Sequence, residues 1–223
     1  MFQSEDSPTI VRIQQNLLAV SERRLLTWLC GRMPAWVTPD LLTAAGMIGA
    51  GAIFAGYAAS ALDAGWLWLA IGGYVLQWFG DSMDGSLARF RKIERPKFGY
   101  FIDHSCDGLA TLLIMAGIGL SPFVRLDIAL IALTGYLLLA IHAFLSAKVL
   151  NELKLSYSAF GPTELRLVLI ALTLAMMTLG AGRPLVGAFS GFDLLFGAVG
   201  VLLIIMFVVQ TLVTARRLMR DGN

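Results

Sequence analysis

Four aspartates stand at the ends of two consecutive apolar segments, and their spacing places them on shared helix faces: Asp81, Asp84, Asp103 and Asp107. Residues three or four positions apart lie on one face of a helix, so each segment presents a pair of carboxylates. Two such pairs on neighbouring helices would repel each other, and some carboxylates would have to bind protons. Two divalent cations would instead cancel the four charges, and oxygen ligands select hard ions such as Mg²⁺ or Mn²⁺.

Salt bridges are the alternative explanation of these carboxylates. The nearest basic residues are Arg89, Arg91 and Lys92, which are confined to the link between the two segments. Because all four aspartates keep face-sharing spacing, we favour a di-metal site, since charges at membrane depth need partners. Gly85 and Ala88 leave room for a phosphate against the helix, and Arg89 can fork onto phosphate oxygens. This combination predicts metal-assisted chemistry at a phosphate.

The composition is that of a membrane protein. The 223 residues are 57% hydrophobic and only 14% charged, with a mean hydropathy of +0.75. Soluble domains carry about 25% charged residues, and disordered chains need low hydrophobicity and high net charge, so both classes are excluded. The net charge of +2 gives no sign of a nucleic-acid partner. Cys30 and Cys106 are too few for a disulfide framework, and the polar residues 1–8 do not resemble a cleavable signal peptide.

Runs of about 20 mostly apolar residues predict six membrane-spanning helices. Their approximate limits are 42–62, 66–88, 99–120, 126–147, 164–181 and 193–214. Residues 9–33 alternate apolar and charged side chains, which favours an amphipathic helix lying in the membrane interface. We therefore predict an all-α polytopic membrane protein, with an N-terminal arm at 1–33 and a six-helix membrane domain at 34–223.

The basic residues predict the orientation. Of the 17 Lys and Arg residues, all but Arg125 and Arg183 fall on one side of the six predicted spans. The positive-inside rule places that side in the cytoplasm. We expect an integral protein of the inner, cytoplasmic membrane of a prokaryote-like cell, with both termini and the aspartates facing the cytoplasm.

The aspartates belong to a longer motif. The string D-S-M-D-G-S-L-A-R, followed after nine residues by G-Y-F-I-D-H-S-C-D, resembles the signature of the CDP-alcohol phosphatidyltransferase (phosphotransferase) superfamily. That signature reads D-x2-D-G-x2-A-R, a spacer, and G-x3-D-x3-D. All its fixed positions are matched here: Asp81, Asp84, Gly85, Ala88, Arg89, Gly99, Asp103 and Asp107. The six predicted spans extend the resemblance over nearly the whole chain.

The resemblance implies a homodimeric membrane enzyme in which the four aspartates hold two Mg²⁺ or Mn²⁺ ions. An acceptor hydroxyl would attack the phosphate of a CDP-linked donor and release CMP, with either donor or acceptor a lipid. Asp107 is implied both as a metal ligand and as the catalytic base. The nucleotide-binding residues implied are Asp40, Thr43, Asp81, Gly85, Ala88 and Arg89.

Asp40 and Thr43 come from a second match. The segment T-P-D-L-L-T at 38–43 resembles the P-[ND]-x-x-T segment that opens the first span in this family. It also reads as an ordinary helix start, and both interpretations can hold. Phosphatidylinositol-phosphate synthases can carry a nucleotide-contacting Thr where this chain has Pro96, so Arg95 or Lys97 could substitute for it.

The substrate signals disagree. The string D-H-S-C-D at 103–107 resembles D-H-G-C-D of choline and ethanolamine phosphotransferases, as does Thr163-Glu164, but the compact six spans favour the type that uses CDP-diacylglycerol. Lys148, Lys154 and Arg166 suit an anionic acceptor such as inositol phosphate or glycerol phosphate, or simply follow the positive-inside rule. His104 could bind the acceptor or only pack between helices. We favour CDP-diacylglycerol as donor, with CDP-choline or CDP-ethanolamine acting on diacylglycerol as the alternative.

Two other functions are alternatives to a transferase. A divalent-cation transporter would hold its acidic residues near the bilayer midplane, often on broken helices, whereas these aspartates fall at cytoplasmic helix ends beside basic residues. A catalytically silent family member could lose its base without penalty, and Asp107 is present. Both remain less favoured alternatives.

Overall fold

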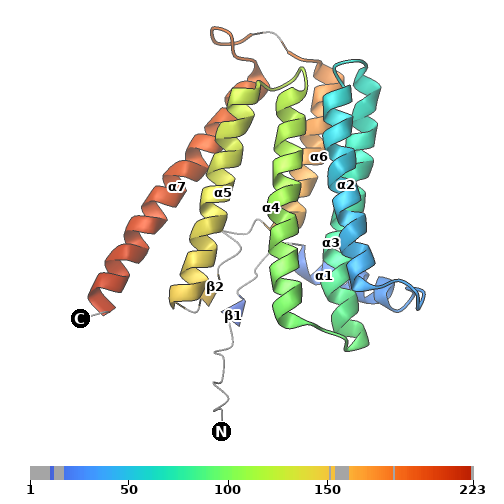
Figure 1. Cartoon of the computed structure of the whole chain (residues 1–223). Helices are drawn as coiled ribbons and strands as arrows, with labels where there is room; N and C mark the ends of the chain where they lie inside the picture. Colours follow the sequence, from blue (N-terminus) through green and yellow to red (C-terminus); the bar gives the residue numbers. More distant parts are fainter. Residues whose placement is uncertain (1–10, 13–17, 151, 154–160, 183, 222–223) are drawn as a thin grey trace.

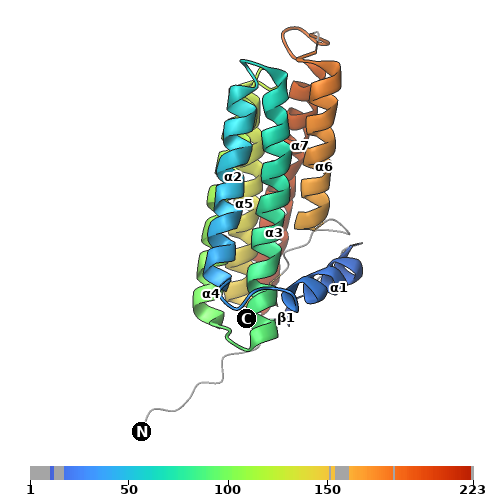
Figure 2. The same ribbon diagram turned by 90° about the vertical axis from the view of Figure 1, so that its right-hand side faces the viewer.

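The computed structural model describes residues 11–12, 18–150, 152–153, 161–182 and 184–221, and this part of the chain is almost entirely helical. Six long helices run alternately up and down, and a shorter one lies across one end of the bundle (Figures 1 and 2). The helices are α1 (Ala19–Cys30), α2 (Pro39–Ala59), α3 (Leu67–Arg91), α4 (Pro96–Leu120), α5 (Leu126–Leu150), α6 (Pro162–Leu179) and α7 (Gly191–Asp221).

Each predicted span falls on one of the helices α2 to α7. Among the described residues, α2, α4, α5, α6 and α7 are long and apolar enough to cross a membrane. The helix α3 is not among these five, because its last three turns carry two aspartates and two arginines. Five of the six predicted segments thus have the length and composition of spanning helices, and the sixth span remains a prediction.

The N-terminal helix is shorter than the predicted stretch 9–33. Val11–Arg12 form a two-residue strand, β1, which pairs in parallel with β2 (Glu152–Leu153), so no helix covers them. Residues 9–10 and 13–17 lie outside the described part of the chain. The helix ends at Cys30, and the turn that follows reaches Pro34, which disfavours helical backbone at the residue before it. The predicted helix over the whole stretch is therefore wrong at both ends.

The helix ends follow local chemistry. The side chain of Thr38 accepts a hydrogen bond from the backbone N–H of Leu41 at 3.2 Å, and Pro39 occupies the first turn of α2, where its missing N–H costs nothing. Proline also opens α6, directly after Gly161. Ser121 ends α4 in an extended conformation. The chain therefore leaves α4 at Ser121-Pro122 and enters α6 at Gly161-Pro162, close to the predicted limits of these spans.

Glycines bring α2 and α3 unusually close. A Cβ placed on Gly80 would collide with the backbone of Gly46 and Leu42, and a Cβ on Gly49 would meet the backbone of Gly73 and Gln77 within 2.8 Å. Small residues of this kind let helix backbones approach each other in membranes. As a result, a side chain on α2 can reach the carboxylates of α3.

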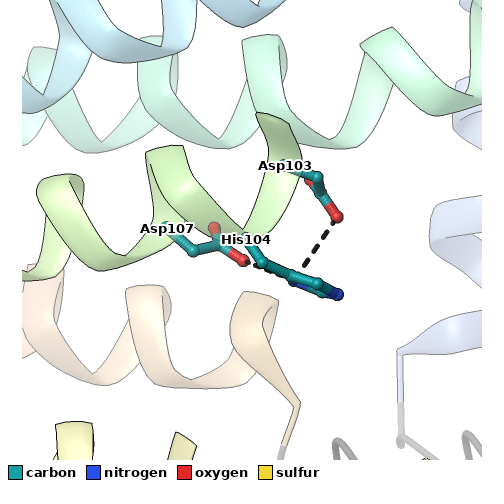
Figure 3. Close-up of side chains that lie close together, drawn as sticks. All are labelled: Asp103, His104 and Asp107. Carbon is teal, nitrogen blue, oxygen red and sulfur yellow. Dashed lines mark ion pairs between the residues drawn. The ribbon is translucent and has the colours of Figure 1, made fainter. Parts of the chain in front are cut away.

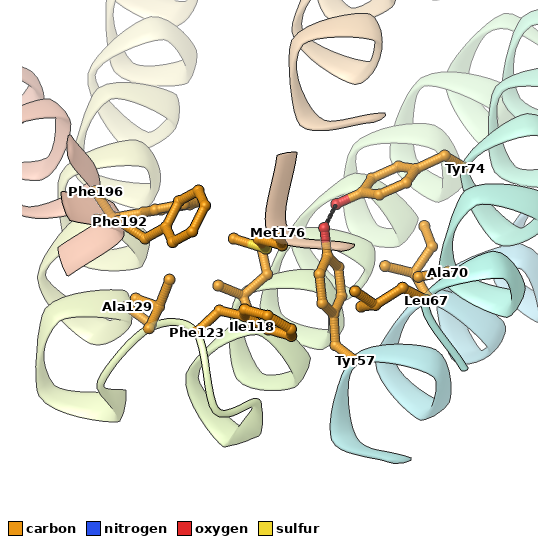
Figure 4. Close-up of a cluster of buried hydrophobic side chains, with 13 residues drawn as sticks. Tyr57, Leu67, Ala70, Tyr74, Ile118, Phe123, Ala129, Met176, Phe192 and Phe196 are labelled. Carbon is orange, nitrogen blue, oxygen red and sulfur yellow. Dashed lines mark hydrogen bonds between the residues drawn. The ribbon is translucent and has the colours of Figure 1, made fainter. Parts of the chain in front are cut away.

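Hydroxyl groups join three helices in the apolar core. The hydroxyl of Tyr57 on α2 lies 2.6 Å from the hydroxyl of Thr173 on α6 and 3.3 Å from that of Tyr74 on α3. Figure 4 shows the two tyrosines facing each other beside Ile118 and Met176. Buried hydroxyls need such partners, and this set fixes α6 against α2 and α3.

Candidate active site

The structure brings the four predicted aspartates to one place. Asp81 and Asp84 project from α3, and Asp103 and Asp107 from α4. All four line a small hollow that also includes Thr43 and the α2 glycine Gly46. The same aspartates also line a cavity of about 1130 Å³ bounded by α1, α2, α3, α4, Tyr136 of α5 and the start of α6. Acidic side chains from two consecutive helices therefore converge on one cavity.

The close approach of α2 and α3 places Thr43 on this cluster. Its hydroxyl Oγ1 lies 2.6 Å from Oδ2 of Asp84 and 3.2 Å from the carbonyl oxygen of Pro39. A hydroxyl has one proton to donate, and the shorter distance favours the carboxylate. Thr43 thus orients Asp84 from the neighbouring helix.

Asp81 has a basic partner that the sequence did not suggest. The guanidinium of Arg166, on the first turns of α6, donates through Nη2 to Oδ2 of Asp81 at 2.6 Å and through Nε to Oε1 of Gln77 at 2.5 Å. The arginine side chain is only 12% exposed and that of Asp81 only 25%. The salt-bridge alternative named Arg89, Arg91 and Lys92, which lie at the end of α3 or directly after it. The observed partner comes instead from α6.

His104 lies between the two aspartates of α4. Its Nδ1 is 3.8 Å from Oδ2 of Asp103 and 3.7 Å from Oδ2 of Asp107 (Figure 3). Its ring packs edge-on against Tyr100 and at a tilt against Phe144. Its other ring nitrogen, Nε2, is buried and has no hydrogen-bond partner among the described residues. Asp103, His104 and Asp107 could hold a metal ion together. The sequence-based prediction included the two aspartates as ligands but not His104, although its one- and three-residue spacing from them was visible.

The predicted nucleotide-binding residues line the same cavity. Gly85 faces Arg89, because a Cβ on Gly85 would stand 3.3 Å from Nη1 of that arginine. Arg89 is exposed, with Nη2 3.4 Å from the hydroxyl of Ser86. Asp40 forms an ion pair with Arg95, and both side chains are more than half exposed. Ala88 also lines the cavity, so each predicted nucleotide-binding residue borders it.

Arg91 donates hydrogen bonds to the loop before α2 and not to the aspartates. Its guanidinium donates to four backbone carbonyl oxygens between α1 and α2: Val37 at 2.5 Å, Pro34 at 2.8 Å, Met33 at 3.2 Å and Ala35 at 3.5 Å. Arginine suits this role because its planar group presents several fixed donors. This interaction holds the segment that leads into Thr38, Pro39 and Asp40, and no sequence motif indicated it.

The residues predicted to bind the acceptor divide into two groups. His104 and Arg166 line the large cavity. Lys148 is exposed near the end of α5 and is not among the residues lining this cavity. Lys154, which was grouped with them, lies outside the described residues.

Comparisons with known proteins agree with the motif. A family model described as CDP-alcohol phosphatidyltransferase matches residues 36–213. An archaetidylinositol phosphate synthase from Methanothermobacter thermautotrophicus is 36% identical over 94 residues, which cover 42% of this chain and 45% of that relative. The chain therefore aligns with somewhat less than half the length of this curated relative.

Proposed function

The chain belongs to the CDP-alcohol phosphatidyltransferase family of enzymes, and from this we propose that it transfers a substituted phosphate group from a CDP-linked donor to a hydroxyl acceptor, releasing CMP. The observation that carries the proposal is the convergence of the motif aspartates and Arg89 on one cavity. A cavity lined by carboxylates and a guanidinium suits a substrate that carries phosphates and divalent ions together.

The donor set fits two divalent ions. Carboxylate oxygens are the preferred ligands of Mg²⁺ and Mn²⁺, and we propose that Asp81, Asp84, Asp103 and Asp107 hold two such ions. When bound, the ions would neutralise the diphosphate and stabilise CMP as a leaving group. Thr43 supports this set, because its hydroxyl fixes the orientation of Asp84 from α2.

The nucleotide is proposed to lie at the mouth of the cavity. The absence of a Cβ at Gly85 leaves space beside the guanidinium of Arg89, and Arg89 is exposed and can turn its donors onto phosphate oxygens. We propose that Asp40, Thr43 and Ala88, which also line the cavity, contact the nucleotide as well.

Asp107 is proposed as the general base. As the acceptor oxygen bonds to the phosphorus of the donor's alcohol phosphate, the bond from that phosphorus to the CMP oxygen breaks, and the hydroxyl proton passes to a carboxylate oxygen of Asp107. A base must lie within hydrogen-bond reach of the proton that it takes. Asp107 lines both the small hollow and the large cavity, so it can meet an acceptor that enters there.

We favour a CDP-activated lipid as donor and a phosphorylated polyol as acceptor. The name of the relative, archaetidylinositol phosphate synthase, indicates this type of product for that protein. Basic side chains inside the cavity, Arg23, Arg95 and Arg166, suit an anionic acceptor. A CDP-amino alcohol with diacylglycerol is the second candidate, favoured by the D-H-S-C-D string and the position of His104 in the cavity.

We propose that α3 is the sixth membrane span and that α1 lies in the membrane interface on the cytoplasmic side. We also propose that both termini face the cytoplasm and that the protein is a homodimer. The end of α7, the link between α3 and α4, and α1 lie at one end of the bundle (Figure 1), and the basic residues gather at that end. The exposed tryptophans Trp28 and Trp36 suit a membrane interface.

The test is a matrix of donors and acceptors. Purified protein with Mn²⁺ or Mg²⁺ receives CDP-diacylglycerol or its ether-lipid counterpart CDP-archaeol, each paired with inositol phosphate, glycerol phosphate or inositol, and CMP is measured. CDP-choline and CDP-ethanolamine with diacylglycerol form a second arm. CMP release only with a lipid donor and a polyol phosphate supports the favoured substrates, and release only in the second arm replaces them. The absence of CMP in every combination contradicts the proposed reaction.

A further inference from the structure

A carboxylate on α1 accepts hydrogen bonds from two other helices. Oε1 of Glu22 lies 2.7 Å from the hydroxyl of Thr163 on α6 and 2.8 Å from Nε1 of Trp78 on α3, and the hydroxyl of Ser82 on α3 lies 3.3 Å away. Hydrogen bonds to a charged acceptor are stronger than those between neutral groups. Glu22 thus joins α1 to α3 and α6 through one oxygen atom.

A second carboxylate makes the reverse connection. Glu164, which is buried, accepts from the backbone N–H of Leu18 through Oε1 at 3.1 Å and from that of Gly161 through Oε2 at 3.0 Å. It therefore satisfies free N–H groups at the starts of both α1 and α6. We call the two reciprocal contacts, Glu22 with Thr163 and Glu164 with Leu18, the α1–α6 clasp.

The clasp adjoins the proposed catalytic groups on two sides. Ser82 stands between Asp81 and Asp84 in the α3 motif. Thr163 lies one turn before Arg166, the side chain that meets Asp81. The clasp therefore borders the carboxylates, while neither Glu22 nor Glu164 belongs to the proposed catalytic groups.

Helix α1 also forms a wall of the large cavity. Its cavity-lining residues are Ala19, Glu22, Arg23, Leu26, Thr27 and Cys30. Leu26 and Cys30 pack into an apolar cluster with Met83 and Leu87 of α3, near the C-terminal end of α1. Nothing comparable holds the N-terminal half among the described residues, where Val20 is 67% exposed. The α1–α6 clasp, together with the hydrogen bonds of Glu22 to α3, is thus what attaches the N-terminal half of α1 to α3 and α6.

We propose that Glu22 is a positioning residue, which holds α1 against α3 and α6 so that this helix closes the wall of the substrate cavity. It acts through Ser82, Trp78 and Thr163 and not on the reacting atoms. The kinetic consequence rests on the proposed function, whereas the structural consequence, the docking of α1, does not.

The test compares wild type with Glu22→Ala in two measurements. The first is the rate at which maleimide labels Cys30, read by mass spectrometry of the peptide so that Cys106 is counted separately. Cys30 is 3% exposed, and burial raises the pKa of its thiol despite the lowering effect of Arg89 and Arg91. We therefore expect slow labelling of Cys30 in the wild-type protein. Loss of the clasp leaves the apolar cluster of Leu26 and Cys30 as the remaining attachment of α1. The whole helix should then open more often, and labelling of Cys30 should speed up by about tenfold or more.

The second measurement is CMP release. The KM for the CDP-linked donor should rise about tenfold, with kcat within about twofold of wild type, because the wall of the binding cavity is loosened while the reacting groups remain. Glu22→Gln, which keeps an acceptor oxygen without the charge, should recover part of both effects. Arg24→Ala, on an exposed position of the same helix outside the cavity lining, should match wild type in both measurements.

Should Glu22→Ala fail to fold, Thr163→Val removes one hydroxyl at nearly constant shape and should change both quantities in the same direction by about threefold. Wild-type labelling of Cys30 in a folded Glu22→Ala or Thr163→Val protein overturns the proposal, as does faster labelling with an unchanged donor KM. If the wild-type protein releases no CMP from any donor, the proposed function fails, while the labelling of Cys30 still decides whether Glu22 docks α1.

Discussion

The guanidinium of Arg166 lies 2.6 Å from Oδ2 of Asp81, although 85 residues separate the two in the chain. One member of the proposed metal-binding set is thus paired with a basic side chain from α6. A divalent cation and Arg166 would compete for the same carboxylate, and an arginine released from Asp81 would remain beside the cavity that it lines. This relationship connects the proposed metal ligands to the proposed acceptor pocket.

Replacing Arg166 by Gln should therefore have opposite effects on the binding of the metal ion and on the binding of the acceptor. Affinity for Mn²⁺ should rise by about tenfold, because a competing positive charge close to the carboxylates is lost. The KM for an anionic acceptor should rise by a similar factor. Electron paramagnetic resonance of free Mn²⁺ measures the first quantity without any turnover, and CMP release at varied acceptor concentration measures the second. An unchanged Mn²⁺ affinity would show that Arg166 does not compete at Asp81.

The base assignment predicts the behaviour of Asp107→Asn. An amide of the same shape cannot accept the hydroxyl proton, so CMP release should fall by about 10²-fold or more. The thermal unfolding midpoint should stay near that of wild type, which shows that the fold is kept. The matched control is Asp127→Asn, at an exposed carboxylate that pairs with Arg125 outside the cavity, and it should retain wild-type turnover. Wild-type activity of Asp107→Asn would remove this residue from the base role.

The nucleotide assignment predicts an asymmetric effect of Arg89→Ala. The donor KM should rise about tenfold through loss of a phosphate contact, while the acceptor KM stays within about twofold. Competition by CDP alone gives an independent readout, since its inhibition constant should weaken in parallel with the donor KM. An unchanged constant for CDP would place the nucleotide elsewhere in the cavity.

The proximity of the four aspartates could be predicted from the sequence, because that inference needs only local helix geometry. Asp81 and Asp84 share a helix face by spacing alone, and the following helix must lie nearby because the link between α3 and α4 is short. Arg166 was selected from the sequence for its charge, but its partner depends on how α6 packs against α3. The same holds for Arg91 and Glu22, whose acceptors and donors lie on segments distant in sequence.

The helix boundaries also differ according to whether they depend on local signals or on contacts between distant segments. The segment T-P-D-L-L-T at 38–43 marked the start of α2, since the signals of a cap and a proline act within one turn. The pairing of Val11–Arg12 with Glu152–Leu153 joins remote backbone segments. An alternation of apolar and charged residues at 9–33 could not reveal it, and for this reason the N-terminal helix was predicted too long.

The role of Arg91 leads to a prediction for Arg91→Lys. Lysine keeps the charge but cannot present forked donors to the carbonyls of Met33, Pro34 and Val37 at once. The loop before α2 should loosen, with a loss of about 1–3 kcal/mol in stability and a higher donor KM because Asp40 and Thr43 follow this loop. Thermal unfolding and CMP release measure the two effects. If the stability and the donor KM of Arg91→Lys both equal those of wild type, the positive charge alone is enough to hold the loop, and the contacts with the carbonyl oxygens are not needed.

The contact between α2 and α3 predicts the effect of Gly80→Ala. The added methyl group would meet the backbone of Gly46 and Leu42, which cannot move aside without separating the two helices. We expect a destabilisation of about 1–3 kcal/mol or more, together with weaker Mn²⁺ binding, because Thr43 would be drawn away from Asp84. The matched control is Gly72→Ala on the same helix, where a Cβ meets nothing within 4 Å and where alanine should stabilise the helix by about 0.5–1 kcal/mol. Thermal unfolding in detergent with and without Mn²⁺ separates the two variants, and equal behaviour of the two would contradict the tight helix contact.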